Sequence, residues 1–113
     1  MQLISLLKDL TYGDTKPVIT KLIENDATKE IRIVFKKGQE MKSHKTPFPI
    51  TVSIFEGAIN FGVDNAEHIL KKGDLISLEP SIIHNLIALE NSIVRLSLSK
   101  NDSVERVQKV TEQ

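Results

Sequence analysis

Hydrophobic and polar residues alternate with a period of two through most of this chain. Near its first third, Ile31, Ile33 and Phe35 alternate with a second set of positions that includes Arg32 and Lys36. A period of two places every second side chain on one face and is typical of half-buried β-strands. The pattern predicts strands over 31–36, 50–55, 59–63, 67–70, 74–78, 84–89 and 93–98.

The breaks between these segments carry Gly, Asn, Asp or Pro at short, regular intervals. These residues supply the positive or fixed φ angles that chain reversals need. Between 30 and 99 no segment shows the 3.6-residue period of an amphipathic helix. Short strands separated by such turns predict an all-β fold, an antiparallel sandwich or barrel.

The two ends of the chain follow other patterns. Ser5 to Leu10 suits one helical turn, and Val18 to Ile23 suits an additional outer strand. Near the C-terminus, Asp102 or Ser103 is suited to cap a short helix. Its apolar face would consist of Val104, Val107 and Val110. A helix this short is marginal alone, so it must dock on the barrel or fray.

Composition narrows the class of protein. With 113 residues the chain suits a single domain, 1–113. Its 15 Lys and Arg balance 15 Asp and Glu, which argues against nucleic acid as a partner. It contains no cysteine, which excludes disulfides and thiol chemistry. No apolar run is long enough for a membrane span and the start does not resemble a signal peptide, so we expect a cytoplasmic protein and no membrane partner.

Two stretches resemble the paired motifs of the cupin superfamily. The first family pattern is G-x5-H-x-H-x3,4-E-x6-G. It aligns, with every spacing kept, on Gly38, His44, Thr46, Ile50 and Gly57. Threonine and isoleucine therefore stand where the family has its second histidine and its glutamate.

The second family pattern is G-x5-P-x-G-x2-H-x3-N. It aligns, again with its spacing kept, on Gly73, Glu79, Ser81, His84 and Ala88. Only the first glycine and the histidine are retained.

The resemblance implies a small RmlC-like cupin, an antiparallel double-stranded β-helix (jelly-roll barrel) with short terminal helical segments. Its motif core would cover about 30–99, preceded by a turn and an outer strand in 1–29 and followed by a short helix or frayed tail in 100–113. Many cupins pair through an N-terminal strand. The resemblance therefore also implies a homodimer, with Val18 to Ile23 as the edge-pairing or exchanged strand.

Metal-binding cupins use two histidines and a glutamate from the first motif and one histidine from the second. By this resemblance, His44 and His84 are the metal ligands that remain. Glu40 is the best third ligand, because it shares strand parity with His44 if 37–44 is extended. Such a set would suit a divalent transition metal, Fe, Mn, Ni or Zn, with Fe(II) or Mn(II) favoured by a 2-His-1-carboxylate site.

The aligned positions also define a candidate ligand cavity. Its lining residues would be His44, Thr46, Phe48, Ile50 and His84. The alternative is that both histidines are buried and hydrogen-bonded to backbone or water. Phe48, between two prolines, is more simply a core residue than a ligand contact. His68 is expected at the surface.

Catalytic motifs are otherwise missing from the sequence. It has no phosphate loop, no G-x-G-x-x-G and no G-x-S-x-G elbow. Three functions are consistent with these residues, and whether the protein is an enzyme is left open. The first is binding of a small molecule, with or without a metal, in the barrel. The second is a metal-dependent dioxygenase or isomerase, and the third is a dimeric interaction protein with a vestigial cavity.

Overall fold

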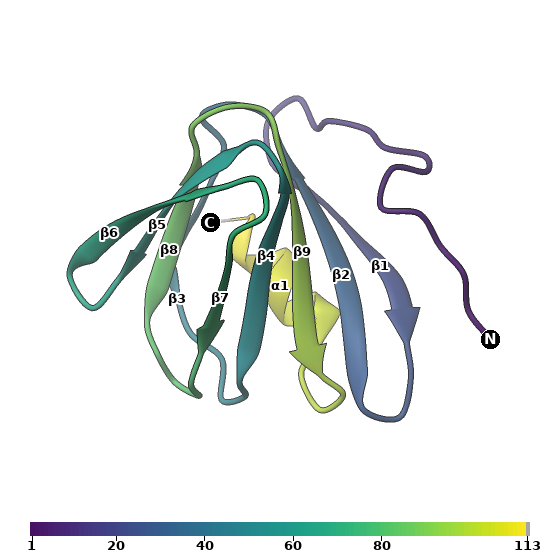
Figure 1. Ribbon diagram of the computed structural model, residues 1–113. Helices are drawn as coiled ribbons and strands as arrows, with labels where there is room; N and C mark the ends of the chain where they lie inside the picture. The colour runs from purple at the N-terminus through teal and green to yellow at the C-terminus, as the bar shows by residue number, and fades with distance from the viewer. Residues whose placement is uncertain (113) are drawn as a thin grey trace.

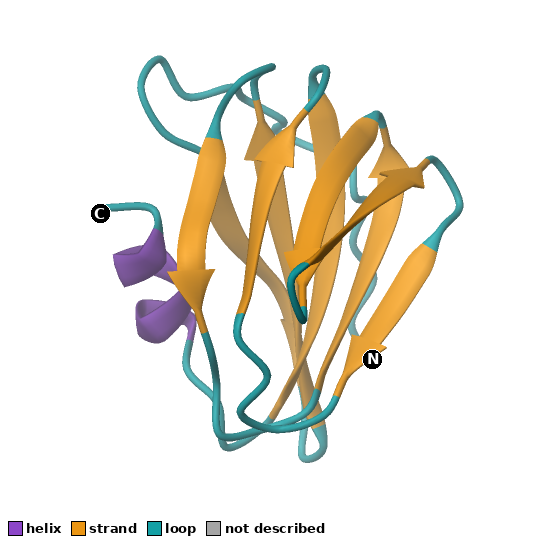
Figure 2. Ribbon diagram, turned by 90° about the vertical axis from the view of Figure 1, so that its left-hand side faces the viewer, coloured by secondary structure: helices purple, strands orange, loops and turns teal. Residues whose placement is uncertain are grey.

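The computed structural model describes residues 1–112, in which nine strands and one short helix form a two-layered barrel (Figure 1, Figure 2). Strands β1, β2, β9, β4 and β7 form one sheet in that order, and β3, β8, β5 and β6 form the other. The strand and helix bounds are β1 Val18–Glu24, β2 Thr28–Phe35, β3 Glu40–His44, β4 Ile50–Glu56, β5 Ala58–Val63, β6 Ala66–Lys71, β7 Leu75–Leu78, β8 His84–Ala88, β9 Ser92–Ser99 and α1 Val104–Val110.

All strand pairings are antiparallel, and the inward-facing side chains of both sheets form one core. On β2, for example, Ile31, Ile33 and Phe35 are almost completely buried. The strands predicted from the alternating pattern and the all-β class are confirmed. β3 is a strand of its own between the first two predicted segments, and the outer strand predicted over Val18 to Ile23 is β1.

The N-terminal segment covers the outer face of the five-stranded sheet. Arg32 points to that face and is nevertheless 3% exposed, because its guanidinium donates hydrogen bonds to the carbonyls of Leu6 and Lys8 at 3.0 and 2.8 Å. Ser5 to Leu10 forms a turn rather than a helix, and Asp9 within it has a φ of 52°. The alternating sequence pattern does not predict that the N-terminal segment covers this face, since Arg32 occupies a position expected to face water.

Helix α1 joins the edges of the two sheets. It contacts β1 and β3, which are edge strands of different sheets, and Figure 2 shows it along that side of the barrel. Ser103 caps the helix by accepting a hydrogen bond from the Arg106 amide at 3.1 Å, while Val107 and Val110 are buried. The predicted C-terminal helix is therefore confirmed. No helix within residues 1–112 has the length and apolar character needed to cross a membrane.

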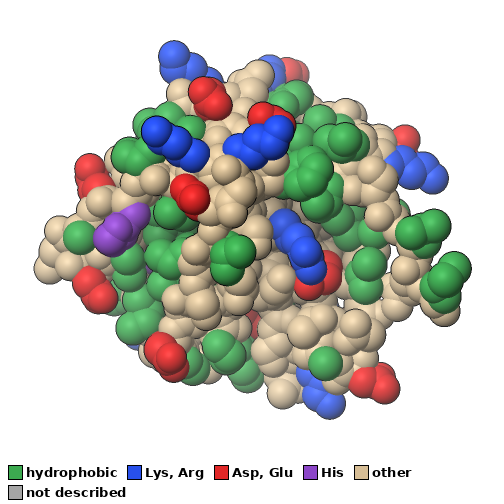
Figure 3. Space-filling model, in the orientation of Figure 1, with side chains coloured by type: hydrophobic (Ala, Val, Ile, Leu, Met, Phe, Trp, Pro, Cys, Tyr) green, Lys and Arg blue, Asp and Glu red, His purple; other side chains and the backbone are tan. Residues whose placement is uncertain are grey.

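Charges are distributed as the composition suggests. In the face shown in Figure 3, Lys and Arg side chains are interspersed with Asp and Glu, and no large area of one sign stands out.

Candidate functional site

His44 and His84 lie directly opposite each other on the inner face of the four-stranded sheet. They are cross-strand partners on β3 and β8, and their ring centroids are 4.2 Å apart with an edge-to-face angle of 63°. Phe61 on β5 stacks on His84 at 5.6 Å and 8°. The two motif histidines, separated by forty positions of sequence numbering, thus form one pair inside the barrel.

Each imidazole is held by the backbone carbonyl two residues before it. The Nδ1 atom of His44 bonds to the Lys42 carbonyl at 2.6 Å, and that of His84 bonds to the Ile82 carbonyl at 2.9 Å. A carbonyl oxygen can only accept, so Nδ1 carries the proton in both rings and each Nε2 keeps its lone pair. The pair therefore offers two hydrogen-bond acceptors from fixed rings.

Both histidines are neutral near pH 7. Burial, together with the nearby His84 and Arg106, lowers the pKa of His44 to about 4 against the opposing effect of the Lys42 carbonyl. Burial also lowers the pKa of His84, with Arg106 acting in the same direction. Two facing imidazoles beside a guanidinium cannot easily accept protons, because the resulting cations would lie close together with little water between them.

The prediction that Glu40 shares a face with His44 is wrong. A β-bulge between Met41 and His44 shifts the register of β3 against β8. As a result Glu40 pairs with Ile87 on the outer face, whereas His44 pairs with His84 on the inner face. A bulge adds one residue to a strand and thereby reverses the side-chain parity beyond it.

Thr46 takes part in a different network from the one its motif position implies. Its hydroxyl donates to Asp102 at 2.7 Å, and Asp102 accepts two hydrogen bonds from the Arg106 guanidinium at 2.7 and 2.9 Å. Burial by itself raises the pKa of Asp102, but the bonds from Arg106, Thr46 and the Ser103 amide outweigh it and hold that pKa below its usual range. This network ties the β3–β4 connection to the start of α1.

The residues present do not fit the metal centre of the family. Such a centre takes about three protein ligands, and the described part of the chain holds no group of three His, Cys, Asp or Glu side chains that could bind an ion. Ile50, at the position of the family's glutamate, is 5% exposed and belongs to the core. The donor set consists of two imidazoles only.

The chamber around the histidines is small. It encloses about 20 Å³ of free space, enough for about one water molecule. Its walls comprise Ile33, Met41, His44, Ile50, Val52, Phe61, His84, Leu86, Val94, Leu96, Arg106 and Val107. The last two belong to α1, so the helix closes the chamber.

The predicted cavity residues separate into three groups. His44, Ile50 and His84 line the chamber, and Thr46 is buried against Asp102. Phe48 is half-buried and does not line the chamber. His68 is exposed on β6, as expected.

The sequence analysis missed Arg106 and the role of Asp102. The one available signal was their i,i+4 spacing of opposite charges at a helix start.

The structural comparison places the fold among known proteins. No family model and no curated protein matches the sequence. An RmlC-like cupin from Desulfovibrio desulfuricans superposes with a TM-score of 0.80 at 22% identity, covering 88% of this chain and 97% of that one. A double-stranded β-helix protein from Klebsiella pneumoniae gives 0.79 at 19% identity, covering 91% and 94%. A putative mannose-6-phosphate isomerase from Ralstonia eutropha gives 0.75 at 17% identity, covering 88% and 98%.

This chain has the cupin fold, a double-stranded β-helix of the RmlC-like type. The resemblance of its two motifs is thereby confirmed at the level of fold. At these identities the similarity establishes the architecture, and the activity must be argued from the site itself.

Proposed function

We propose that this protein is a cupin that binds a small molecule between His44 and His84, without a catalytic metal. The observation that carries the proposal is the fixed pair of neutral imidazoles, each with a free Nε2, in one small chamber. Two acceptors so oriented suit a ligand that presents O–H or N–H donors. The Arg106 guanidinium beside them is paired with Asp102, so the chamber has little net charge and favours a neutral ligand.

Binding requires α1 to move. The chamber has room for about one water molecule, and two of its wall residues, Arg106 and Val107, come from the helix. A helix of seven residues has little stability of its own and depends on the contacts it makes with the barrel. Displacing it enlarges the chamber on the side where both imidazoles lie.

The imidazole signals in a proton–carbon NMR spectrum test this proposal. The titrant is 1,2-ethanediol, which donates two O–H groups, and its dimethyl ether, which donates none, is the matched control. We expect ethanediol to shift the signals of His44 and His84, at lower concentration in Asp102→Asn, where α1 is loosened. The exposed His68 is the internal reference. Unchanged His44 and His84 signals in a variant whose α1 is demonstrably open would refute the proposal.

The nearly filled chamber favours a second candidate, a dimeric interaction protein. β1 is an edge strand of the five-stranded sheet and therefore has one side free of strand partners among residues 1–112. Edge strands are natural sites for pairing with a second copy. Sedimentation equilibrium tests it: a mass of two chains that persists on dilution supports the homodimer, and a mass of one chain at all concentrations overturns it.

A further inference from the structure

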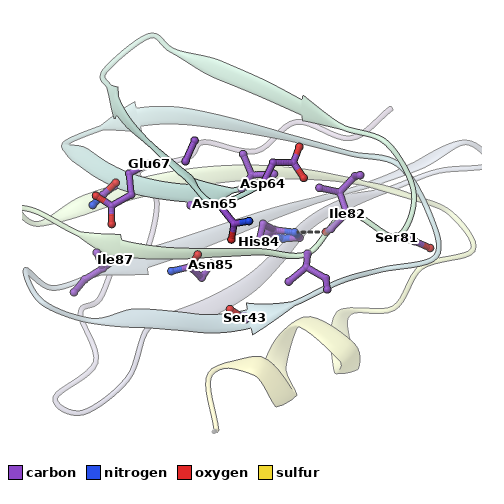
Figure 4. Close-up of a pocket in the computed structure, with 14 residues that line it drawn as sticks. Ser43, Asp64, Asn65, Glu67, Ser81, Ile82, His84, Asn85 and Ile87 are labelled. Atoms are coloured by element: carbon purple, nitrogen blue, oxygen red, sulfur yellow. Dashed lines mark hydrogen bonds between the residues drawn. The ribbon is translucent and has the colours of Figure 1, made fainter.

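A second hollow lies outside the barrel, on the outer face of the four-stranded sheet. It has a volume of about 640 Å³, within the range usual for small-molecule sites. Figure 4 shows Asn65 and Glu67, from the β5–β6 hairpin, across the hollow from Asn85 and Ser43, on β8 and β3. The histidine chamber is on the opposite face of the same sheet, and His84 lines both the chamber and the groove.

Gly62 creates the floor of this groove. It pairs with Asn85 on β8 and with Glu67 on β6, so the three residues form one row across the sheet. A Cβ atom on Gly62 would come within 2.3 Å of the Asn85 Oδ1 atom. The missing side chain therefore leaves space in the middle of the row, and the Asn85 amide leans into that space.

The polar side chains around the groove are not used by the protein itself. Three asparagines and two carboxylates line it, and the structure records no side-chain hydrogen bond or ion pair for any of them within residues 1–112. They are Asn60, Asn65, Asn85, Asp64 and Glu67. The Oδ1 atom of Asn60 is also buried without a donor. Buried acceptors normally have partners, so an orphan at a groove points to a donor supplied from outside.

Asparagines elsewhere in this molecule differ from those of the groove, because their side chains bond the protein's own backbone. Asn25 accepts bonds from the amides of Ala27 and Thr28, and Asn91 accepts one from Lys37. Those asparagines stabilise turns, which explains their presence without a ligand.

We propose that this groove binds a cationic amino polyol. Acceptors dominate its polar lining, and no Lys or Arg of residues 1–112 lines it. Asp64 and Glu67 favour a positive charge, while the three amides offer acceptors and donors for hydroxyl groups. A phosphorylated or carboxylate ligand would meet like charge and no cation.

Backbone amide shifts in proton–nitrogen NMR measure this binding. The titrants are glucamine, which is cationic, sorbitol, which is the neutral match, and sorbitol 6-phosphate, which is anionic. We expect glucamine to shift amides in 60–67 and 81–87 and to bind more tightly than sorbitol, with no binding of the phosphate. Equal affinity for the phosphate, or shifts confined to other regions, would overturn the proposal.

Two glutamate variants localise the charge. Glu67→Gln should weaken glucamine binding by about threefold or more, the effect of one partly exposed ion pair. Glu90→Gln, an exposed carboxylate outside the groove, should leave it unchanged. An otherwise unchanged spectrum establishes that Glu67→Gln is folded, and an unaltered affinity in that variant argues against the site. His84 lines both sites, so the amides in 60–67 report on the groove and the imidazole signal of His44, which does not line the groove, reports on the chamber. With these two readouts, this proposal and the function above succeed or fail separately.

Discussion

At the residue scale, the chemistry of the barrel interior depends on a few substitutions. Two histidines of the cupin motif are retained, while Thr46 bonds Asp102 and Ile50 packs in the core. Two neutral imidazoles bring no negative charge to offset a divalent cation, and the adjacent Arg106 opposes one. The interior thereby suits a hydrogen-bonding ligand better than a metal.

Metal analysis tests this directly. We expect protein incubated with iron, manganese, nickel or zinc and then desalted to retain far less than one metal per chain. The double variant His44→Ala/His84→Ala should retain no less than the wild type. A near-stoichiometric metal that the double variant loses would contradict the argument from the donor set.

A glycine pair separates backbone strain from steric clash. Gly57 and Gly73 both have a φ of 93°, which costs an L-residue about 1–2 kcal/mol. A Cβ on Gly57 would also lie 2.2 Å from the Ser92 Oγ atom, whereas a Cβ on Gly73 would meet nothing within 4 Å. We expect Gly57→Ala to lower the free energy of unfolding by about 1–3 kcal/mol more than Gly73→Ala does. Urea denaturation of both variants measures it, and equal losses would show that the Asn91 carbonyl oxygen and the Ser92 Cα atom, 2.6 and 2.7 Å from that Cβ, move away at no cost.

Ser81 has a backbone conformation that favours glycine, although it is not one. The family has a glycine at this motif position, and Ser81 keeps a left-handed backbone with a φ of 68°. Its amide donates to the Thr46 carbonyl at 2.7 Å, which joins the loop after β7 to the loop after β3. The turn geometry is thus retained although the residue type is not.

At the element scale, α1 is the piece most easily separated from the barrel. It is short, and the hydrogen bonds that Asp102 accepts from Thr46 and Arg106 hold its N-terminal end. Asp102 is buried, so its bonds are little screened by water. The helix is therefore stabilised by tertiary contacts more than by its own sequence.

Hydrogen exchange tests this role of Asp102. We expect Asp102→Asn to lose about 1.5–3 kcal/mol of stability, the value of hydrogen bonds to a charged group. The loss should appear as faster amide exchange in 104–110, with exchange in β2 and β9 much less affected. Glu105→Gln, an exposed acid on the same helix, is the control. Uniformly faster exchange throughout the barrel would show that α1 and the sheets open together.

At the scale of the whole molecule, the histidine pair couples stability to pH. A free histidine has a pKa of 6.5, while that of folded His44 is about 4 and that of His84 is also lowered. Below pH 6.5 the unfolded chain takes up protons that the folded protein does not. The free energy of unfolding should therefore have its full value above pH 6.5. It should fall as the pH decreases toward 4, by at most about 1.4 kcal/mol per pH unit for each histidine.

Urea unfolding at pH values from 7 to 4 measures this slope. His44→Gln/His84→Gln should flatten it, whereas His68→Gln, at an exposed position, should leave it in place. Facing the pair is Arg106, which adds to the penalty on protonation. The partner of Arg106 is Asp102, whose lowered pKa confines its own loss of stability to more acidic pH. A slope unchanged in the double variant would assign it to other groups.

The alternation of apolar residues and the spacing of turn residues were sufficient to predict the all-β class, every strand position except that of β3, and the capped C-terminal helix. These features are local, because strand parity and turn conformation depend on residues a few positions apart. The two motifs also placed His44 and His84 at matching positions, and the structure brings these residues together.

Only the tertiary structure decided which groups surround His44 and His84. The bulge in β3 moved Glu40 to the outer face, and the docked helix brought Arg106 into the chamber and filled it. Likewise, the outer groove joins residues of β3, β5, β6 and β8, whose proximity depends on sheet order. Register shifts and helix docking result from packing between distant segments, whereas periodicity records only which face of its own strand each residue occupies.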